Sequence, residues 1–244
     1  MIRKIIICIL VFSALGEAQA QVTLDLEGGI VPSTNYNKVR IPNNGGTLVN
    51  LPDELDLNAK LFYRARLSYR FSGRHQVSAL YAPLTVTYKG NFGNPVLFNG
   101  ITFGTGQPVK VNYKFNSYRL TYRYDVISTR KWELGVGLTA KIRDADIRFR
   151  NESSDTHFDN IGFVPLVNFK AAYKAARWTF LIEGDALASK QGRAEDIFAG
   201  ASYLFTPKFG IKAGYRVLEG GADSDEVYNF NWINYASVGV LLTL

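Results

Sequence analysis

The 244-residue chain has one cysteine, two histidines and no long apolar segment after its first twenty residues. A single thiol excludes a scaffold held together by internal disulfides. A helix that spans a membrane needs ~18–20 consecutive apolar residues, so the main part of the chain is not a helical membrane protein. Apolar residues nevertheless make up 47% of the chain and aromatic residues 14%, which excludes a disordered protein. What remains is a folded chain rich in β-structure.

Residues 1–20 have the order of a secretory signal. Arg3 and Lys4 precede an apolar run from Ile5 to Leu15, and Ala18-Gln19-Ala20 supplies the small residues expected before a cleavage site. The single cysteine, Cys8, lies in the apolar run. We therefore expect residues 1–20 to be a signal peptide and residues 21–244 to form one exported domain without cysteine.

Apolar and polar residues alternate along most of residues 21–244. In residues 63–71, Tyr, Ala, Leu, Tyr and Phe share one face, while Arg, Arg, Ser and Arg share the other, as on a β-strand. The pattern predicts ten strands, near residues 22–30, 57–71, 75–88, 109–127, 132–149, 162–173, 177–187, 196–206, 208–218 and 231–244. Short turns alternate with long loops, which is typical of an up-and-down meander. Weak pairing of 162–173 or of 196–206 would leave eight strands in the membrane.

The apolar residues change face twice, at Pro83-Leu84 and near Arg143-Asp144. Both positions lie towards the long-loop end of their strands. Each change predicts a β-bulge at the rim of the sheet, because an inserted residue reverses the alternation.

Alternation does not say which face points inward, since a soluble barrel alternates with its apolar face inside. Here the polar face carries long charged side chains, and aromatic residues such as Tyr63, Trp132 and Trp178 gather near strand ends on the apolar face. The chain ends on an apolar strand, whose open edge in lipid would leave backbone amides unpaired. We therefore predict an all-β fold, an antiparallel up-and-down transmembrane β-barrel in which the last strand closes against the first.

Two segments, Asp185–Ala194 and Gly214–Asp223, resemble a poorly characterised group of small β-barrel proteins of the Gram-negative outer membrane. The resemblance implies a barrel of this topology, located in the bacterial outer membrane, and it implies no activity. Outer-membrane lipid and lipopolysaccharide are then the expected partners, and the expected state is a monomer.

If the apolar face contacts lipid, the charged side chains of the other face meet inside the barrel. The lumen charge network that we predict contains Arg64, Arg66, Arg119, Arg123, Glu133, Lys141, Arg143, Glu183, Asp185, Lys212 and Arg216, together with Lys60, Lys170, Asp25 and Glu27. A barrel of about ten strands is only slightly wider than the eight-stranded barrel that side chains fill. A packed network of ion pairs is therefore the first interpretation. The alternative is a narrow passage that prefers anions, or a pocket for a small anionic ligand such as a phosphate or a carboxylate.

Acidic residues gather in the last two long loops. We predict a polar cluster at the loop end, formed by Arg193, Glu219, Asp223, Asp225 and Glu226. Asp223, Asp225 and Glu226 offer the oxygen ligands that Ca²⁺ prefers, but their spacing does not match a known calcium loop, and a solvated acidic loop explains them as well. We expect no metal and no cofactor.

An enzymatic site would depend on His157, because His75 follows a short turn at the opposite end. Asp155 and Asp159 flank His157, and a base next to a carboxylate is what an outer-membrane protease or a lipid-modifying enzyme needs. The same residues are also common in solvated loops. The basic residues form no single patch, so nucleic-acid binding is not expected.

Residues 90–108 form a long loop without charge. It could constrict the lumen, contact lipid or a partner, or extend two strands as a hairpin above the membrane. Taken together, these features predict a non-enzymatic outer-membrane β-barrel protein that is structural or binds a ligand at its extracellular loops. A small anion-preferring pore is the first alternative, and a hydrolase or acyltransferase using His157 is the second.

Overall fold

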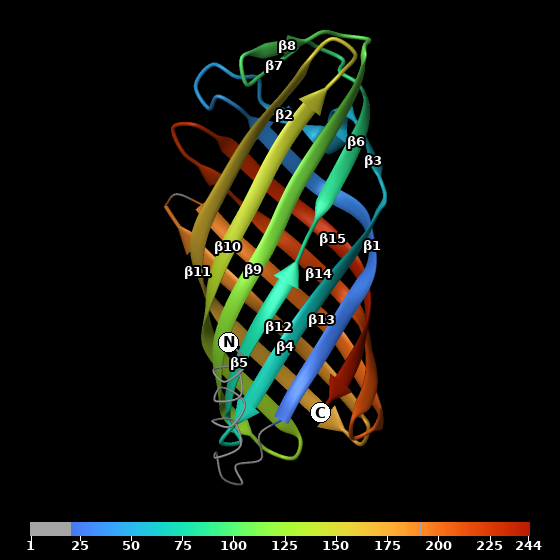
Figure 1. Cartoon of the computed structure of the whole chain (residues 1–244), viewed down its shortest axis with the longest axis vertical. Coiled ribbons are helices and arrows are strands. Elements are labelled where there is room, and N and C mark those ends of the chain that lie inside the picture. Colours follow the sequence, from blue (N-terminus) through green and yellow to red (C-terminus); the bar gives the residue numbers. More distant parts are fainter. Residues whose placement is uncertain (1–20, 191) are drawn as a thin grey trace, which may run out of the picture.

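Long antiparallel strands wind around a closed, tilted barrel (Figure 1). The computed structural model describes residues 21–190 and 192–244, so the predicted signal peptide lies outside the described residues. Ten strands of the described chain form the wall. They are β1 (Gln21–Arg40), β4 (Lys60–Phe71), β5 (His75–Ala82), β9 (Pro108–Ser128), β10 (Trp132–Arg150), β11 (Asp155–Ala175), β12 (Trp178–Ser189), β13 (Gly192–Thr206), β14 (Phe209–Asp223) and β15 (Tyr228–Thr243).

Neighbours in sequence pair around the ring, and β15 pairs with β1 to close it. Short elements complete the loop end: β2 (Val49–Asn50), α2 (Leu51–Glu54), β3 (Asp56–Asn58), β6 (Thr85–Asn91), β7 (Val96–Phe98) and β8 (Ile101–Phe103). No helix of the described residues is long and apolar enough to cross a membrane.

The predicted fold class is confirmed, and so is the predicted number of ten strands in place of the alternative of eight. Residues 162–173 and 196–206 lie in β11 and β13, which are both paired. The main difference is the first strand, which was predicted to end at residue 30 and continues to Arg40. Register shifts against β15 between Ile30 and Tyr36 bend β1, and these shifts hide the continuation from a simple count of alternating residues.

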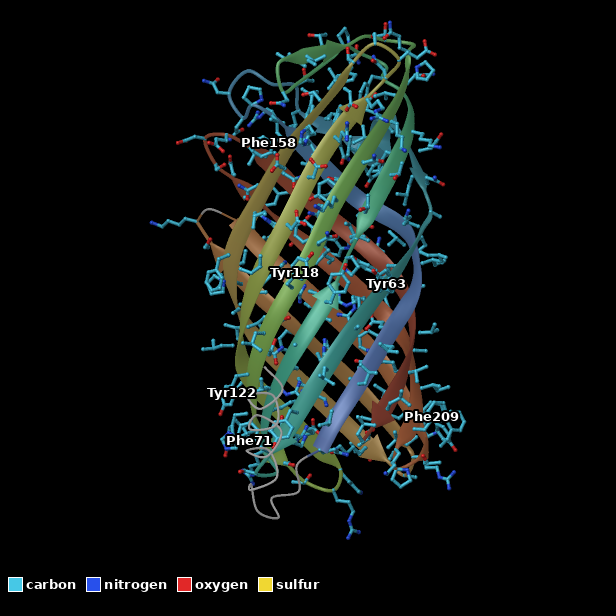
Figure 2. All side chains as sticks on the ribbon, viewed as in Figure 1. Tyr63, Phe71, Tyr118, Tyr122, Phe158 and Phe209 are labelled. Carbon is cyan, nitrogen blue, oxygen red and sulfur yellow. The ribbon has the colours of Figure 1, made fainter. Side chains whose placement is uncertain are left out.

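The lower half of the barrel, where the short turns lie, has an apolar outer face. On β10, Leu138 is 68% exposed, whereas its neighbour Thr139 is 2% exposed and points inward. Figure 2 shows Phe71, Tyr122 and Phe209 on the lower part of the wall and Tyr63 higher on it. Soluble proteins seldom expose so large a continuous apolar surface. The lower half therefore has the outer surface of a barrel that is embedded in a lipid bilayer.

The upper half has the opposite polarity. Further along β10, Ile147 and Phe149 are buried inside the barrel, while Asp146 and Arg148 point outward. The pairing of β10 with β9 and with β11 nevertheless runs without a shift from Gly135 to Arg150. The same side of β10 therefore faces inward along its whole length, and the chemistry of its two sides exchanges where the surroundings change from lipid to water.

This continuity corrects the two predicted bulges. No residue is inserted at Arg143-Asp144. At Pro83-Leu84 the strand is interrupted, but β5 and β6 keep one common register with β9, from Ala82–Ser117 to Thr85–Lys114. The prediction was wrong because it assumed one environment outside the barrel for the whole strand.

Apolar side chains fill much of the upper interior, and the uncharged loop lies over them. Phe92, Phe98 and Phe103 from this loop are buried around Phe149, and the rings of Phe98 and Phe149 stack with centroids 3.9 Å apart. The pairing of β6 with β9 forms the hairpin extension that was one of the three alternatives for this loop. Its tip, with β7 and β8, lies at the upper end of the molecule (Figure 1). The loop therefore closes part of the barrel mouth.

Candidate functional site

Asp196 is the centre of a buried ion-pair network in the lower half of the barrel. Its carboxylate oxygens lie 2.6 Å from Arg119, 2.7 Å from Arg216 and 3.0 Å from Arg64. Arg216 also donates two hydrogen bonds to Glu27, each 2.7 Å long. These five side chains come from β1, β4, β9, β13 and β14, so the network ties opposite sides of the wall together.

A second group of ion pairs lies nearer the short turns. Glu133 lies 2.7 Å from Lys170, 2.8 Å from Lys174 and 3.2 Å from Arg70. Further pairs join Arg119 to Asp185, Arg66 to Glu183, Lys212 to Asp25 and Glu27, and Arg123 to Asp125 and Glu133, and Asp125 also pairs with Arg70. The gap between the network and the apolar core above it has a volume of only about 10 Å³. Side chains therefore leave little free space at this point of the interior.

All eleven residues of the predicted lumen network lie on inward-facing positions, but the members of the observed network differ from those predicted. Asp196 was left out of the predicted network, because it was predicted to be the first residue of its strand, whereas the strand begins four residues earlier, at Gly192. Asp125 and Arg70 were also missed, although both continue the alternation of their strands and that signal was available. Lys60 is exposed and is not part of the ion pairs.

Lys141 and Arg143 differ from the other inward cations because neither forms an ion pair with a carboxylate of the described residues. Lys141 is 2% exposed, and its ammonium group lies 4.8 Å from the centre of the Phe115 ring. Arg143 donates a hydrogen bond to the side-chain oxygen of Asn160, while its Nε is buried without a partner among the described residues. Both basic side chains thus lie on the inner side of the wall with no carboxylate of the described residues within ion-pair distance.

These two cations line a cavity of about 800 Å³ at the loop end. The cavity lies between the upper parts of β9–β11 and those of β12–β15. Its apolar lining includes Phe115, Ile147, Phe158, Val164, Leu187 and Leu218, and the acidic loop between β14 and β15 also lines it. A mainly apolar space with a few convergent cations is the usual form of a ligand pocket.

The predicted polar cluster at the loop end is only partly assembled. Arg193 lies 2.7 Å from Glu219, and Tyr36 donates a hydrogen bond to the same carboxylate. Burial and this hydrogen bond raise the pKa of Tyr36. Asp223 instead accepts a hydrogen bond from Asn43, 2.8 Å long. Asp225 and Glu226 are exposed, and the described residues contain no group of acidic or histidine side chains placed to hold a metal ion.

His157 lies on the outer face of the wall and not in the cavity. Its Nδ1 is 2.9 Å from Asp146 and 3.9 Å from Asp159. Asp155, the other predicted partner, is held by Arg148 and Arg150, whose hydrogen bonds lower its pKa. Phe158 lines the cavity, so the side chains on either side of it point the opposite way along β11. The structure brings His157 next to a carboxylate, but it separates this pair from the cavity.

Comparison with known proteins shows the fold. No family model matches the sequence, and no curated protein matches it. The chain is similar to the outer membrane protease OmpT from Escherichia coli, with 11% identity, a TM-score of 0.54, and 92% of this chain and 97% of that chain covered. It is also similar to the attachment invasion locus protein Ail of Yersinia pestis, with 10% identity, a TM-score of 0.40, and 91% and 99% covered. The fold is that of the bacterial outer-membrane β-barrels.

Proposed function

We propose that this outer-membrane barrel conducts no ions, is not an enzyme, and binds a small anionic ligand in the cavity at its loop end. The observation that carries the proposal is the position of Lys141 and Arg143 on the cavity wall without a carboxylate in ion-pair contact among the described residues. A buried cation is costly unless an opposite charge or hydrogen bonds compensate it. A bound carboxylate or phosphate would supply that compensation.

The ion-pair network argues against the first alternative, a pore. Arg64, Arg119 and Arg216 all bind Asp196 inside the lower half, and each of these side chains is almost fully buried. Ions would have to break several short, buried ion pairs to pass. The barrel is therefore expected to give no single-channel steps in planar lipid bilayers, and steady steps would favour the pore.

The position of His157 argues against the second alternative, an enzyme. The pair formed with Asp146 is on the outer wall, whereas the cavity that could hold a substrate is inside. Catalysis needs the base within hydrogen-bond reach of the reacting group, directly or through one water. A ligand in the cavity has no such contact with His157.

Titration calorimetry of the folded barrel with inorganic phosphate and with hexanoate tests the proposal. The variant Lys141→Met removes a charged hydrogen-bond donor, whose loss costs about 1.5–3 kcal/mol and should weaken binding by about 10–100-fold. Lys114→Met is the matched control, because Lys114 is on the same barrel wall but outside the cavity and pairs with Asp144. Equal binding by both variants, or no binding of either anion to the unaltered barrel, would overturn the proposal.

A further inference from the structure

The wall of the barrel is open on one side above the membrane-facing band. The ladder between β11 and β12 begins at Ala175–Trp178 and ends, in the described part of the chain, at Val167–Ala186. β11 continues beyond this point to Asp155, and its other edge stays paired with β10 as far as Arg150–Asp155. One edge of β11 over residues 155–166 therefore has no strand beside it among the described residues.

The hairpin of β12 and β13 turns back well below the upper end of β11, with Ser189 and Gly192 as its last pair. Figure 1 shows this hairpin ending lower on the wall than β11. Pro165 lies in the open stretch of β11, and a proline is suited to such an edge because it has no N–H group to leave unpaired.

The cavity reaches the outside at this opening. Its lining includes Phe163, Val164 and Pro165 from the free edge of β11, and Leu187 and Ser189 from the top of the hairpin. Phe163 is 64% exposed and points away from the barrel axis, next to the lipid-facing band. Val164 is the direct cross-strand partner of Lys141. An apolar path therefore runs from the outer wall to the unpaired cations.

The approach to the cavity from the loop end is lined by negatively charged side chains. Asp223, at the end of β14, and Asp225 and Glu226, in the loop that follows it, line this side of the cavity. Carboxylates at a mouth repel an approaching anion, whereas the gap beside Phe163 and Pro165 is apolar. The lateral gap suits a ligand that has an apolar chain and an anionic end.

We propose that the ligand is a single-chain lipid with an anionic headgroup, a carboxylate or a phosphate, which enters sideways between β11 and β12. This inference rests on the proposed function and names its ligand class. The headgroup binds Lys141 and Arg143, and the acyl chain lies along Phe163 and Pro165 towards the outer leaflet. The cavity lining supplies the apolar contacts for the part of the chain that is inside the wall.

The test compares ligands of different chain length on the barrel held in an amphipathic polymer. Decanoate and decyl phosphate are titrated against hexanoate and hexyl phosphate. Each methylene that is buried should raise the affinity about fourfold, so the four added methylenes should raise it by roughly two orders of magnitude. Affinity that does not change with chain length would overturn the inference, even where the short anions bind through Lys141.

Two matched variants locate the chain. Phe163→Asp places a carboxylate in the proposed path, and it should weaken binding of the ten-carbon ligands at least tenfold while the six-carbon ligands bind as before. Ile161→Asp is the control, since Ile161 is 72% exposed on the same face of β11 but does not line the cavity. Equal effects of the two variants would contradict the lateral path. Binding of short anions that survives Lys141→Met would instead contradict the proposed function itself.

Discussion

Replacing Asp196 with Asn tests whether the buried ion pairs hold the barrel together. The substitution keeps the size of the side chain and removes the charge that three arginines share. Arg216 retains Glu27 and Arg119 retains Asp185, but the described ion pairs leave Arg64 with no other carboxylate. Removing one partner of a buried pair costs about 3–5 kcal/mol, and the remaining partners favour the lower value, about 3 kcal/mol.

In a chain of this length, 1 kcal/mol shifts the melting temperature by about 2–4 °C, so the midpoint should fall by about 6–12 °C. The shift from the folded to the unfolded band on cold detergent gels, followed against temperature, measures the midpoint. Asp144→Asn is the matched control: it breaks a pair with Lys114 that is 2.8 Å long, within the range of the Asp196 pairs, but partly exposed, and such pairs contribute about 0–1 kcal/mol. Equal shifts for Asp196→Asn and Asp144→Asn would refute the reasoning.

Three further predictions concern the upper half. Phe149→Ala removes the ring on which Phe98 stacks, so it should lower the free energy of unfolding by about 3–5 kcal/mol and make residues 90–108 accessible to protease. Unchanged cleavage would show that other contacts hold the loop. His157→Ala should leave the melting temperature and ligand binding unchanged, and loss of a hydrolytic or acyl-transfer activity would contradict the non-enzymatic proposal. Burial raises the pKa of Tyr113, so the fold favours its neutral phenol. This contribution to stability is complete below the ordinary tyrosine pKa of about 10 and falls as the pH rises above it. Phenolate absorbance and melting temperatures at pH 8 and pH 11 measure the effect.

The barrel itself could be predicted from the sequence because its cause is local. Successive residues on a strand face opposite sides, so segments such as 63–71 display both the lipid face and the lumen face directly. The closure of the ring follows from the requirement that no backbone edge remains open in lipid. Nothing in these arguments depends on which distant residues touch.

The inside of the barrel could be predicted only in part, because ion pairs depend on strand register and on strand ends. Arg64 and Asp196 are far apart in sequence and meet only across the closed ring. An error of four residues at the start of β13 placed Asp196 at the very end of its predicted strand, and the residue was left out of the predicted network. Whether Lys141 has an ion-pair partner likewise depends on where each neighbouring carboxylate lies along the barrel axis.

The open edge of β11 could not be predicted because alternation reports only the two faces of a strand. Residues 155–166 have the same pattern whether or not a strand lies beside them. The prediction of two bulges was wrong for a related reason. The apolar residues change face near Arg143 because the surroundings of the strand change, and not because a residue is inserted in the backbone.

The exchange of polarity along the strands has a consequence for how the protein reaches its final position. Asp146, Arg148 and Arg150 lie on the outside of β10, beyond the lipid-facing residues, and Lys110 and Lys114 have similar places on β9. All of them must travel through the hydrocarbon layer before the barrel is complete, and each Arg or Lys on a lipid-exposed face at the bilayer centre costs about 2–4 kcal/mol. Insertion therefore requires a route that shields the tips of these hairpins from acyl chains until they emerge on the far side.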